Sequence, residues 1–560
     1  MNSPQIPQNR RARISLLLAL SCLAGVAYVR GSTVQHLSIT QPGGMPGRPV
    51  MTGISPGSNS VTLTWDGPSG YYQVFKKVGA HGTWQAVGAR TNMARTATVS
   101  VPAGSANTLF KVLGPAPQYA GSPTCIECHG PVHATEQYTD HAKAFKTLQQ
   151  IGQDKNAACL PCHTVGYGLS TGFVNYSTTP QLAGVQCENC HGPAGNHAAN
   201  PDDPTVIPRV EVAATVCGGC HTGPENPTYE EWSGSGHGTV TEPNMNALTC
   251  GRCHIGPARL AMVYHQTVNT NDTTLGVVCL TCHDQHGQHT FTNYLNGRIS
   301  FTNQLTGLSL VITNNELGRV YSSQVRNPFG STRDYYLTTT DVFTNKYDPS
   351  INLCAQCHNH RGANWTSSSR PPHHSPQYNM LIGTVGLLDS GTPNFPSTHS
   401  RLESQCVTCH MQTTPFQYGP PEVAADTGHK FVVDNYEACV RCHGSTNDAQ
   451  GLVDFAKQSI TYQIEQVKSL LDLWATTKAP PALTAKYGTL AWEYTNPGDL
   501  SSGTAGPNST EQLLIPDTIR KARFNLYLVL YDGSYGAHNG PYAITLLETA
   551  QSWVEEALSQ

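Results

Sequence analysis

Nine short stretches of the sequence share the pattern Cys-x-x-Cys-His, from CIECH near residue 125 to CVRCH near residue 439, and they hold 18 of the 19 cysteines. Two thiols at this spacing can form thioether bonds to the edge of one haem. The histidine that follows directly then lies under the iron and ligates it. The pattern therefore predicts nine covalently attached c-type haems.

The predicted site residues form two sets. The predicted thioether residues are Cys125, Cys128, Cys159, Cys162, Cys187, Cys190, Cys217, Cys220, Cys250, Cys253, Cys279, Cys282, Cys354, Cys357, Cys406, Cys409, Cys439 and Cys442. The predicted proximal ligands are His129, His163, His191, His221, His254, His283, His358, His410 and His443. Zinc sites, disulfide frameworks and redox Cys-x-x-Cys pairs do not require this histidine, and histidine is only 24 of 560 residues, so the haem interpretation is favoured.

The second axial position of each iron decides what the haem can do. A second histidine makes a low-spin electron carrier, whereas an open position permits substrate chemistry. Thirteen histidines outside the motifs follow residue 117, enough to complete nine irons. The preferred distal ligands are His141, His197, His237, His265, His286, His374, His399, His429 and His538, and the expected bystanders are His133, His289, His360 and His373.

Two of these choices are between close neighbours. We prefer His374 over His373 in PPHHSPQYNM, and His286 over His289 in HDQHGQH. In GVQCENCHGPAGNH, His197 follows His191 by six residues. To reach the same iron, the chain would have to pass around the whole macrocycle while making a Gly-Pro turn, so His197 is expected to serve a neighbouring haem.

The N-terminal residues 1–30 are typical of an export signal. Three arginines precede a mostly apolar run from Ile14 to Val29, with small residues near its end. Sixteen residues are fewer than the about 20 that span a bilayer, so a retained anchor is the less favoured alternative. Cys22 is a weak lipoprotein signal. We expect an exported protein of the periplasm or cell surface, where c-type haem is attached, with peripheral or anchored membrane association as an alternative.

The fold class predicted is multidomain: a β-sandwich, then a loop-rich, mainly α multihaem domain, then a helical C-terminal region. Residues 46–116 alternate apolar and polar side chains between Gly, Asn and Pro breaks, which predicts antiparallel strands. The order of Trp65, Tyr72, Val74, Trp84 and Phe110 resembles a fibronectin type III domain. Such a domain would be a docking module or a passive spacer.

Residues 118–445 carry all nine motifs, about 36 residues per haem. This density predicts that the haems themselves form the core and lie close together. The interval between the sixth and seventh motifs is the longest, and RISFTNQLTGLSLVITNN within it predicts a hairpin or small sheet. Residues 446–560 carry no motif, and their apolar periodicity predicts three helices, with His538 in the turn before the last.

Residues 119–200, with GSPTCIECH, YTDHAKAF, ACLPCHTVGYG and GVQCENCHGPAGNH, resemble the cytochrome c554 family. The resemblance implies haem attachment at the first three motifs and axial roles for His141 and His197. The segment around GSYGAHNGPYA is similar to the ends of multihaem nitrite reductases and hydroxylamine oxidoreductases, where the matching histidine is a haem ligand. No motif here ends in lysine, unlike the catalytic haem of many such reductases, and nine haems exceed the four of the c554 type and the eight of the oxidoreductases.

Together these features predict an exported electron-transfer protein with nine mostly bis-His haems. Its expected partners are redox proteins or an extracellular electron acceptor, and the β-domain is compatible with a homo-oligomer or filament. The net charge of −4 argues against nucleic-acid binding. The alternative is an enzyme acting on small nitrogen or sulfur oxyanions, with one five-coordinate haem.

Overall fold

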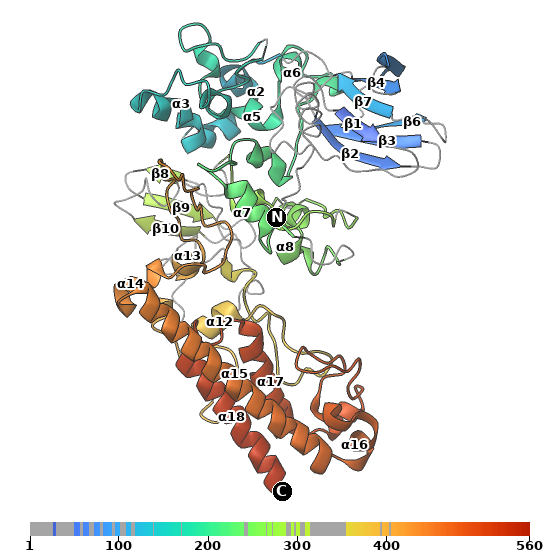
Figure 1. Cartoon of the computed structure of the whole chain (residues 1–560), viewed down its shortest axis with the longest axis vertical. Coiled ribbons are helices and arrows are strands. Elements are labelled where there is room, and N and C mark those ends of the chain that lie inside the picture. The colour runs from blue at the N-terminus through green and yellow to red at the C-terminus, as the bar shows by residue number, and fades with distance from the viewer. Residues whose placement is uncertain are drawn as a thin grey trace, which may run out of the picture. The chain divides into compact units, whose positions relative to one another are not determined.

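The computed structural model divides the chain into two units, which are described separately below (Figure 1). It describes residues 26–29, 50–56, 60–66, 72–78, 82–91, 96–100, 108–113, 118–137, 139–169, 171–239, 245–264, 266–271, 273–286, 293–295, 298–302, 309–313, 354–391, 395–402 and 405–560. Unit 1 comprises residues 1–223, 284–288 and 322–324, and unit 2 the remainder. Cys22, His36, His81, His265 and His289 lie outside the described residues, as does most of the predicted export signal.

The N-terminal part of unit 1 consists of two small, open antiparallel sheets. One has the strand order β1 (Val26–Val29), β7 (Thr108–Leu113), β4 (Tyr72–Val78) and β5 (Gln85–Thr91). The other has the order β2 (Val50–Pro56), β3 (Ser60–Asp66) and β6 (Thr96–Ser100). The strands predicted over residues 46–116 are thus present. Strand β1, however, lies within the predicted export signal and pairs with β7 from Val26–Lys111 to Val29–Thr108.

Side chains from both sheets share one apolar core. Val61, Leu63 and Trp65 of β3 alternate inward, as do Tyr72 and Val74 of β4, and they pack with buried residues of β7. The rings of Trp65 and Tyr72 lie 5.6 Å apart. The period-two alternation in the sequence therefore corresponds to burial of one face of each sheet.

The rest of unit 1 is built from short helices and loops. They are α2 (Ser122–Glu136), α3 (Asp140–Gln150), α4 (Leu160–His163), η2 (Pro180–Leu182), α5 (Cys187–His191), α6 (Gly195–Ala199), η3 (Pro204–Val206) and η4 (Ala214–Gly219). Helix α2 is kinked at His129, two residues before Pro131, whose ring cannot be accommodated by a straight helix. The apolar core here is small and is formed around Phe145, Leu160 and Phe173.

The first part of unit 2 has the same loop-rich character. Its helices are α7 (Thr228–Gly234), α8 (Gly251–His254), α9 (Gly256–Val263), α10 (Cys279–Cys282), α12 (Gln377–Leu381), η6 (His399–Arg401), α13 (Gln405–His410) and α14 (Glu437–His443). A three-stranded antiparallel sheet joins β8 (Asn293–Leu295), β9 (Arg298–Thr302) and β10 (Ser309–Thr313). The small sheet predicted in the longest interval between motifs is therefore confirmed.

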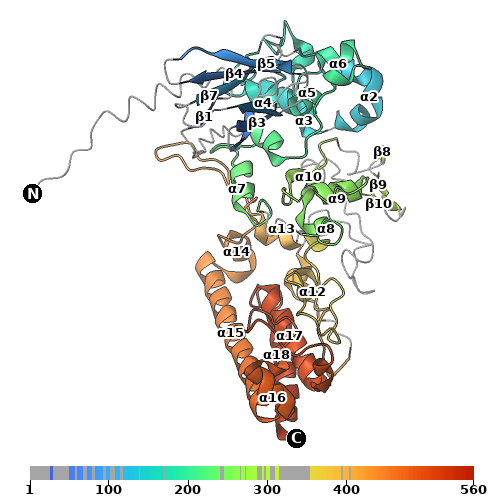
Figure 2. The ribbon, with the colours of Figure 1, turned by 90° about the vertical axis from the view of Figure 1, so that its right-hand side faces the viewer.

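The C-terminal part of unit 2 is a helical bundle. Helix α15 (Thr446–Thr477) begins at a capping box formed by Ser445 and Asp448 and lies beside α17 (Asp517–Asp532) and α18 (Gly540–Ser559) (Figures 1 and 2). The connecting elements are α16 (Pro481–Tyr487), η7 (Gly488–Trp492) and η8 (Glu511–Leu514). The three predicted helices are confirmed, and they enclose the largest apolar core of the described residues. No helix among the described residues is long and apolar enough to cross a membrane.

Candidate haem-binding sites

Five of the attachment motifs fold into a single helical turn from the first cysteine to the histidine. The backbone N–H of His163, His221, His254, His283 and His358 each donates to the carbonyl oxygen of the first cysteine of its motif, at 2.9–3.2 Å. This i to i−4 bond closes one turn, and residues three or four apart lie on the same face of a helical turn. The two thiols and the imidazole of a motif are therefore presented on one side, as attachment and ligation of a single haem require.

Seven motif histidines face a second histidine ring across a nearly constant gap. The ring centres lie 5.9–6.2 Å apart in every pair. Two bonds of about 2.0 Å from one metal to two imidazole nitrogens leave ring centres roughly 6 Å apart, so the gap fits an iron between each pair. The pairs are His221 with His141, His191 with His286, His358 with His237, His254 with His373, His283 with His429, His443 with His399, and His410 with His538.

Most of the preferred distal residues occupy these positions. His141, His237, His286, His399, His429 and His538 each lie opposite a motif histidine. His191 faces His286, so its partner ring is not that of His197. His197 is half-buried, and its Nδ1 is buried without a hydrogen-bond partner.

The ring that faces His254, at 5.9 Å, is that of His373 and not that of the preferred His374. The Nδ1 of His373 lies 3.0 Å from the hydroxyl of Ser375, which donates to the carbonyl oxygen of Asn359. His374 instead stacks on Tyr531, with ring centres 3.7 Å apart, and its side chain is 60% exposed. Adjacent side chains in extended backbone point to opposite sides. Contacts with distant residues therefore decide whether His373 or His374 faces His254.

Two motif histidines have no opposed ring among the described residues. His129 is exposed, and His163 is held by a 3.0 Å contact between its Nδ1 and the carbonyl oxygen of Ala144. His265, one of the preferred ligands, lies outside the described residues. Of the preferred distal residues in unit 1, His197 is the one that is not opposed to a motif histidine.

The Nδ1 atoms of eight histidines at these sites are held by oxygen atoms. A metal-binding imidazole usually donates its second ring N–H to such an oxygen, which fixes the tautomer and aims Nε2 at the metal. The contacts are His163 to Ala144 O, His191 to Arg209 O, His399 to Ala537 O, His410 to Phe431 O, His429 to Thr427 O, His358 to Gln377 Oε1, His373 to Ser375 Oγ and His538 to Asp532 Oδ1, at 2.7–3.4 Å.

Burial keeps several of these imidazoles neutral. It lowers the pKa of His237 and of His373 to about 4, because a charged imidazolium is disfavoured away from water. Only the neutral form offers a nitrogen lone pair to a metal. Both rings are therefore ready to ligate at neutral pH.

The motif CENCH is fixed in place by one of its own intervening residues. Glu188, fully buried, accepts backbone N–H bonds from Ala120, Gly121 and Ala194 at 2.7–3.1 Å. Burial raises the pKa of this carboxyl, and the three N–H donors oppose that effect. The bonds connect α5 to the segments on both sides of it, so the orientation of His191 is set by the backbone.

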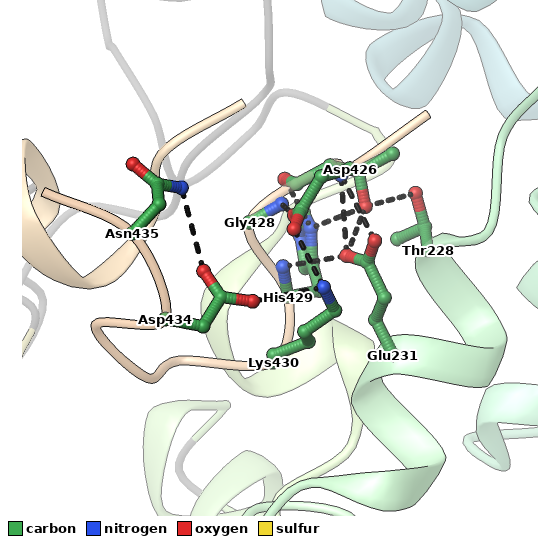
Figure 3. Close-up of polar contacts among 9 residues, drawn as sticks. Thr228, Glu231, Asp426, Gly428, His429, Lys430, Asp434 and Asn435 are labelled. Carbon is green, nitrogen blue, oxygen red and sulfur yellow. Dashed lines mark hydrogen bonds and ion pairs between the residues drawn. The ribbon is translucent and has the colours of Figure 1, made fainter. Parts of the chain in front are cut away.

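A buried glutamate in unit 2, which the sequence analysis did not identify, positions a distal histidine in a similar way (Figure 3). Glu231 of α7 accepts bonds from the N–H and hydroxyl of Thr427, at 3.0 and 2.7 Å, and from the N–H of His429, at 2.9 Å. Asp426 accepts from the Gly428 N–H and from Lys430 at the outer edge of the same loop. The loop that presents His429 to His283 is thus tied to α7 by one carboxylate.

Replacing Glu231 by Gln should weaken the hydrogen bonds that hold the loop of His429 and should lower the stability of the protein. A neutral amide has one acceptor oxygen and would turn an N–H group toward the remaining donors, so a cost of about 1–3 kcal/mol in free energy of unfolding is expected. Glu230→Gln, on the exposed face of the same helix, is the matched control. Denaturant unfolding and the low-spin ferric spectrum measure the two effects, and equal behaviour of the two variants would show that Glu231 does not position His429.

Thiols of different motifs also meet. Cys125 is hydrogen-bonded to Cys187 and Cys162 to Cys220 in unit 1, while Cys253 bonds Cys357 and Cys354 bonds Cys406 in unit 2. If each thiol holds the edge of a haem, these predicted sites adjoin at their edges. Among the described residues, no three His, Cys, Asp or Glu side chains converge as a metal-ion site would need.

Residues 124–192 match the family described as cytochrome c554 and c-prime. Cytochrome c-554 of Nitrosomonas europaea is 33% identical over 95 residues, a match that covers 14% of this chain and 40% of that protein. The match covers the first three motifs, and together with the repeat of the motif it supports covalent attachment of several c-type haems.

Three solved structures are similar at low sequence identity. The outer cell wall cytochrome OcwA is 18% identical, covering 78% of this chain and 99% of its own, with a TM-score of 0.47. The undecaheme cytochrome from the S-layer of Carboxydothermus ferrireducens is 17% identical, covering 79% and 70%, with a TM-score of 0.46. The cytochrome c nitrite reductase of Desulfovibrio desulfuricans is 15% identical, covering 58% and 67%, with a TM-score of 0.29.

Proposed function

We propose that this protein is an exported electron carrier that relays electrons along nine covalently bound haems, most of them with two histidine ligands. The observation that carries the proposal is the set of seven opposed imidazole pairs, each spaced for one iron. Bis-His iron has no open position for a substrate, so such a haem carries electrons and does little else. The protein supplies attachment, axial ligands and orientation.

The order of the relay follows from the thiol contacts inside each unit. In unit 1, the site at Cys125 adjoins the one at Cys187, and the site at Cys162 adjoins the one at Cys220. Cys190 and Cys217 are close enough to interact electrostatically, which joins the two pairs into one line.

In unit 2, the motif that begins at Cys354 lies between two others, because Cys357 bonds Cys253 and Cys354 bonds Cys406. The line continues from Cys409 toward Cys439 through an electrostatic contact. The exposed thiols of the set, Cys128 and Cys442, belong to sites at the ends of these lines and mark the proposed points of electron entry and exit.

The remaining parts of the proposal concern partners and the β-domain. Electrons would be exchanged with redox proteins or with an extracellular acceptor. The two small sheets, as a fibronectin type III-like module, would dock the carrier to a surface, to a membrane-bound partner or to further copies in an oligomer or filament. His197, which lies in the same unit as His129 and His163, is the proposed second ligand for one of their irons.

A second candidate function rests on the motif histidines His129 and His163, because neither has an opposed ring among the described residues. A five-coordinate iron at one of them would leave a position for a small nitrogen or sulfur oxyanion, and the protein would then be a reductase or oxidase.

Electron paramagnetic resonance of the oxidised, haem-loaded protein separates the two functions. The carrier should give only low-spin ferric signals, unchanged by added nitrite or hydroxylamine. One high-spin iron per chain that shifts with either compound would establish the enzyme instead. Iron and haem content per chain tests the count of nine independently, and a value other than nine would correct that part of the proposal.

A further inference from the structure

His538 differs from the other histidines with a described Nδ1 contact in the group that holds its ring. Of the eight histidines whose Nδ1 contact is described above, seven face neutral oxygens of backbone carbonyls, an amide or a hydroxyl. The Nδ1 of His538 faces a carboxylate oxygen, Oδ1 of Asp532, at 2.7 Å. Its ring faces that of His410, with ring centres 6.2 Å apart.

The carboxylate is held rigidly. Asp532 is the last residue of α17, and its side chain is only 4% exposed. Gly533 follows in the left-handed conformation with a φ of 69°, which ends the helix and turns the chain back. The hydroxyl of Ser534 donates to the second oxygen of Asp532 and accepts the N–H of His538 at 3.2 Å. Carboxylate, hydroxyl and imidazole thus form a closed ring of hydrogen bonds.

A carboxylate acceptor changes an axial imidazole more than a carbonyl does. It draws the Nδ1 proton toward itself, makes the ring a stronger electron donor and raises its basicity as a ligand. A nearby buried negative charge also stabilises the more positive ferric iron. Both effects favour the oxidised haem, and hydrogen bonding to axial ligands is one of the means by which proteins set haem potentials.

We propose that Asp532 is a positioning residue that lowers the reduction potential of the haem between His410 and His538 below that of the haems whose histidines contact neutral oxygens. This inference rests on the proposed electron-transfer function. The site lies between those at Cys354 and Cys439, through the contacts of Cys406 and Cys409. This haem would be the last of the line to become reduced. Electrons that move between the exposed site at Cys442 and the site at Cys354 would therefore have to pass a haem of lower reduction potential, which is an uphill step.

The test uses Asp532→Asn in the full, haem-loaded chain. The amide keeps the size of the side chain and removes its charge. The matched control is Asp499→Asn, which removes a 70% exposed carboxylate beside the stacked His374. In a spectroelectrochemical titration, the transition of one haem should shift to a more positive potential in Asp532→Asn, and one low-spin ferric signal should change its g-values. The control should leave all transitions in place.

A second variant predicts a shift of opposite sign. Ser534→Ala removes a donor that competes for the carboxylate, so Asp532 should bind His538 more strongly and the same transition should become more negative. Unshifted transitions in both variants would overturn the inference, and so would a high-spin iron in Asp532→Asn, because Asp532 would then only hold the ring in place. Absence of bis-His signals in the unmodified protein would instead refute the proposed function.

Discussion

Chains produced without haem attachment should lose the fold of residues 118–445 and retain the C-terminal bundle. In the described part of that region, apolar clusters are small: six buried residues around Phe145 and Leu160, and three around Ala258. Such clusters cannot offset the entropy of ordering so many residues. The bundle of α15, α17 and α18, by contrast, buries a large apolar cluster of its own.

Limited proteolysis with mass spectrometry, beside far-UV circular dichroism, measures this effect. The haem-free chain should be cut throughout residues 118–445, while a fragment close to residues 446–560 persists and remains helical. The haem-loaded chain is the control and should resist cleavage in both regions. Equal resistance of both regions without haem would show that the protein core, and not the cofactor, stabilises the motif region.

Leu471→Ala should destabilise the bundle by about 2–5 kcal/mol in free energy of unfolding. Leu471 lies on the inner face of α15 with no exposed surface. Truncation to Ala removes buried apolar area and leaves a cavity that rigid neighbours cannot close. Denaturant unfolding followed by circular dichroism gives the free energy directly.

The neighbouring leucine on the same helix is the control. Leu473 is 47% exposed, so Leu473→Ala should change the free energy of unfolding by no more than about 0.5 kcal/mol. A similar loss from both substitutions would mean that the outer face of α15 is covered in solution. No loss from Leu471→Ala would contradict the packing of the bundle.

The local chemistry of the sites could be predicted from the sequence because it depends on neighbours in the chain. The spacing of each motif dictates the single helical turn that aligns Cys159 with His163, and apolar periodicity dictates α15. Period-two alternation likewise predicted β3 and β4. In α15, β3 and β4, the same spacing of apolar residues that favours the helix or strand also places those residues on the buried face.

The arrangement of the second ligands depends on tertiary contacts, which a local pattern does not contain. His373 and His374 are adjacent and equivalent in sequence, and they differ in the distant rings that they meet, His254 for the first and Tyr531 for the second. Nothing near His191 in the chain indicates that His286 will face it. Glu231 and Asp532 were missed for the same reason, since one carboxylate among many acquires its role only from the segment it contacts.

The opposed histidine pairs have a mechanical consequence. Each joins residues far apart in the chain, such as His141 with His221 or His237 with His358. An iron bound to both therefore acts as a cross-link, in addition to the thioether bonds at the motif, and restricts the unfolded chain as a disulfide does. If a competing ligand displaced one distal imidazole, the chain segment between the two histidines of that pair would lose its cross-link, while the other pairs would keep theirs. Exchange of a ligand at such an iron would therefore be coupled to local unfolding of the segment that the histidine pair closes.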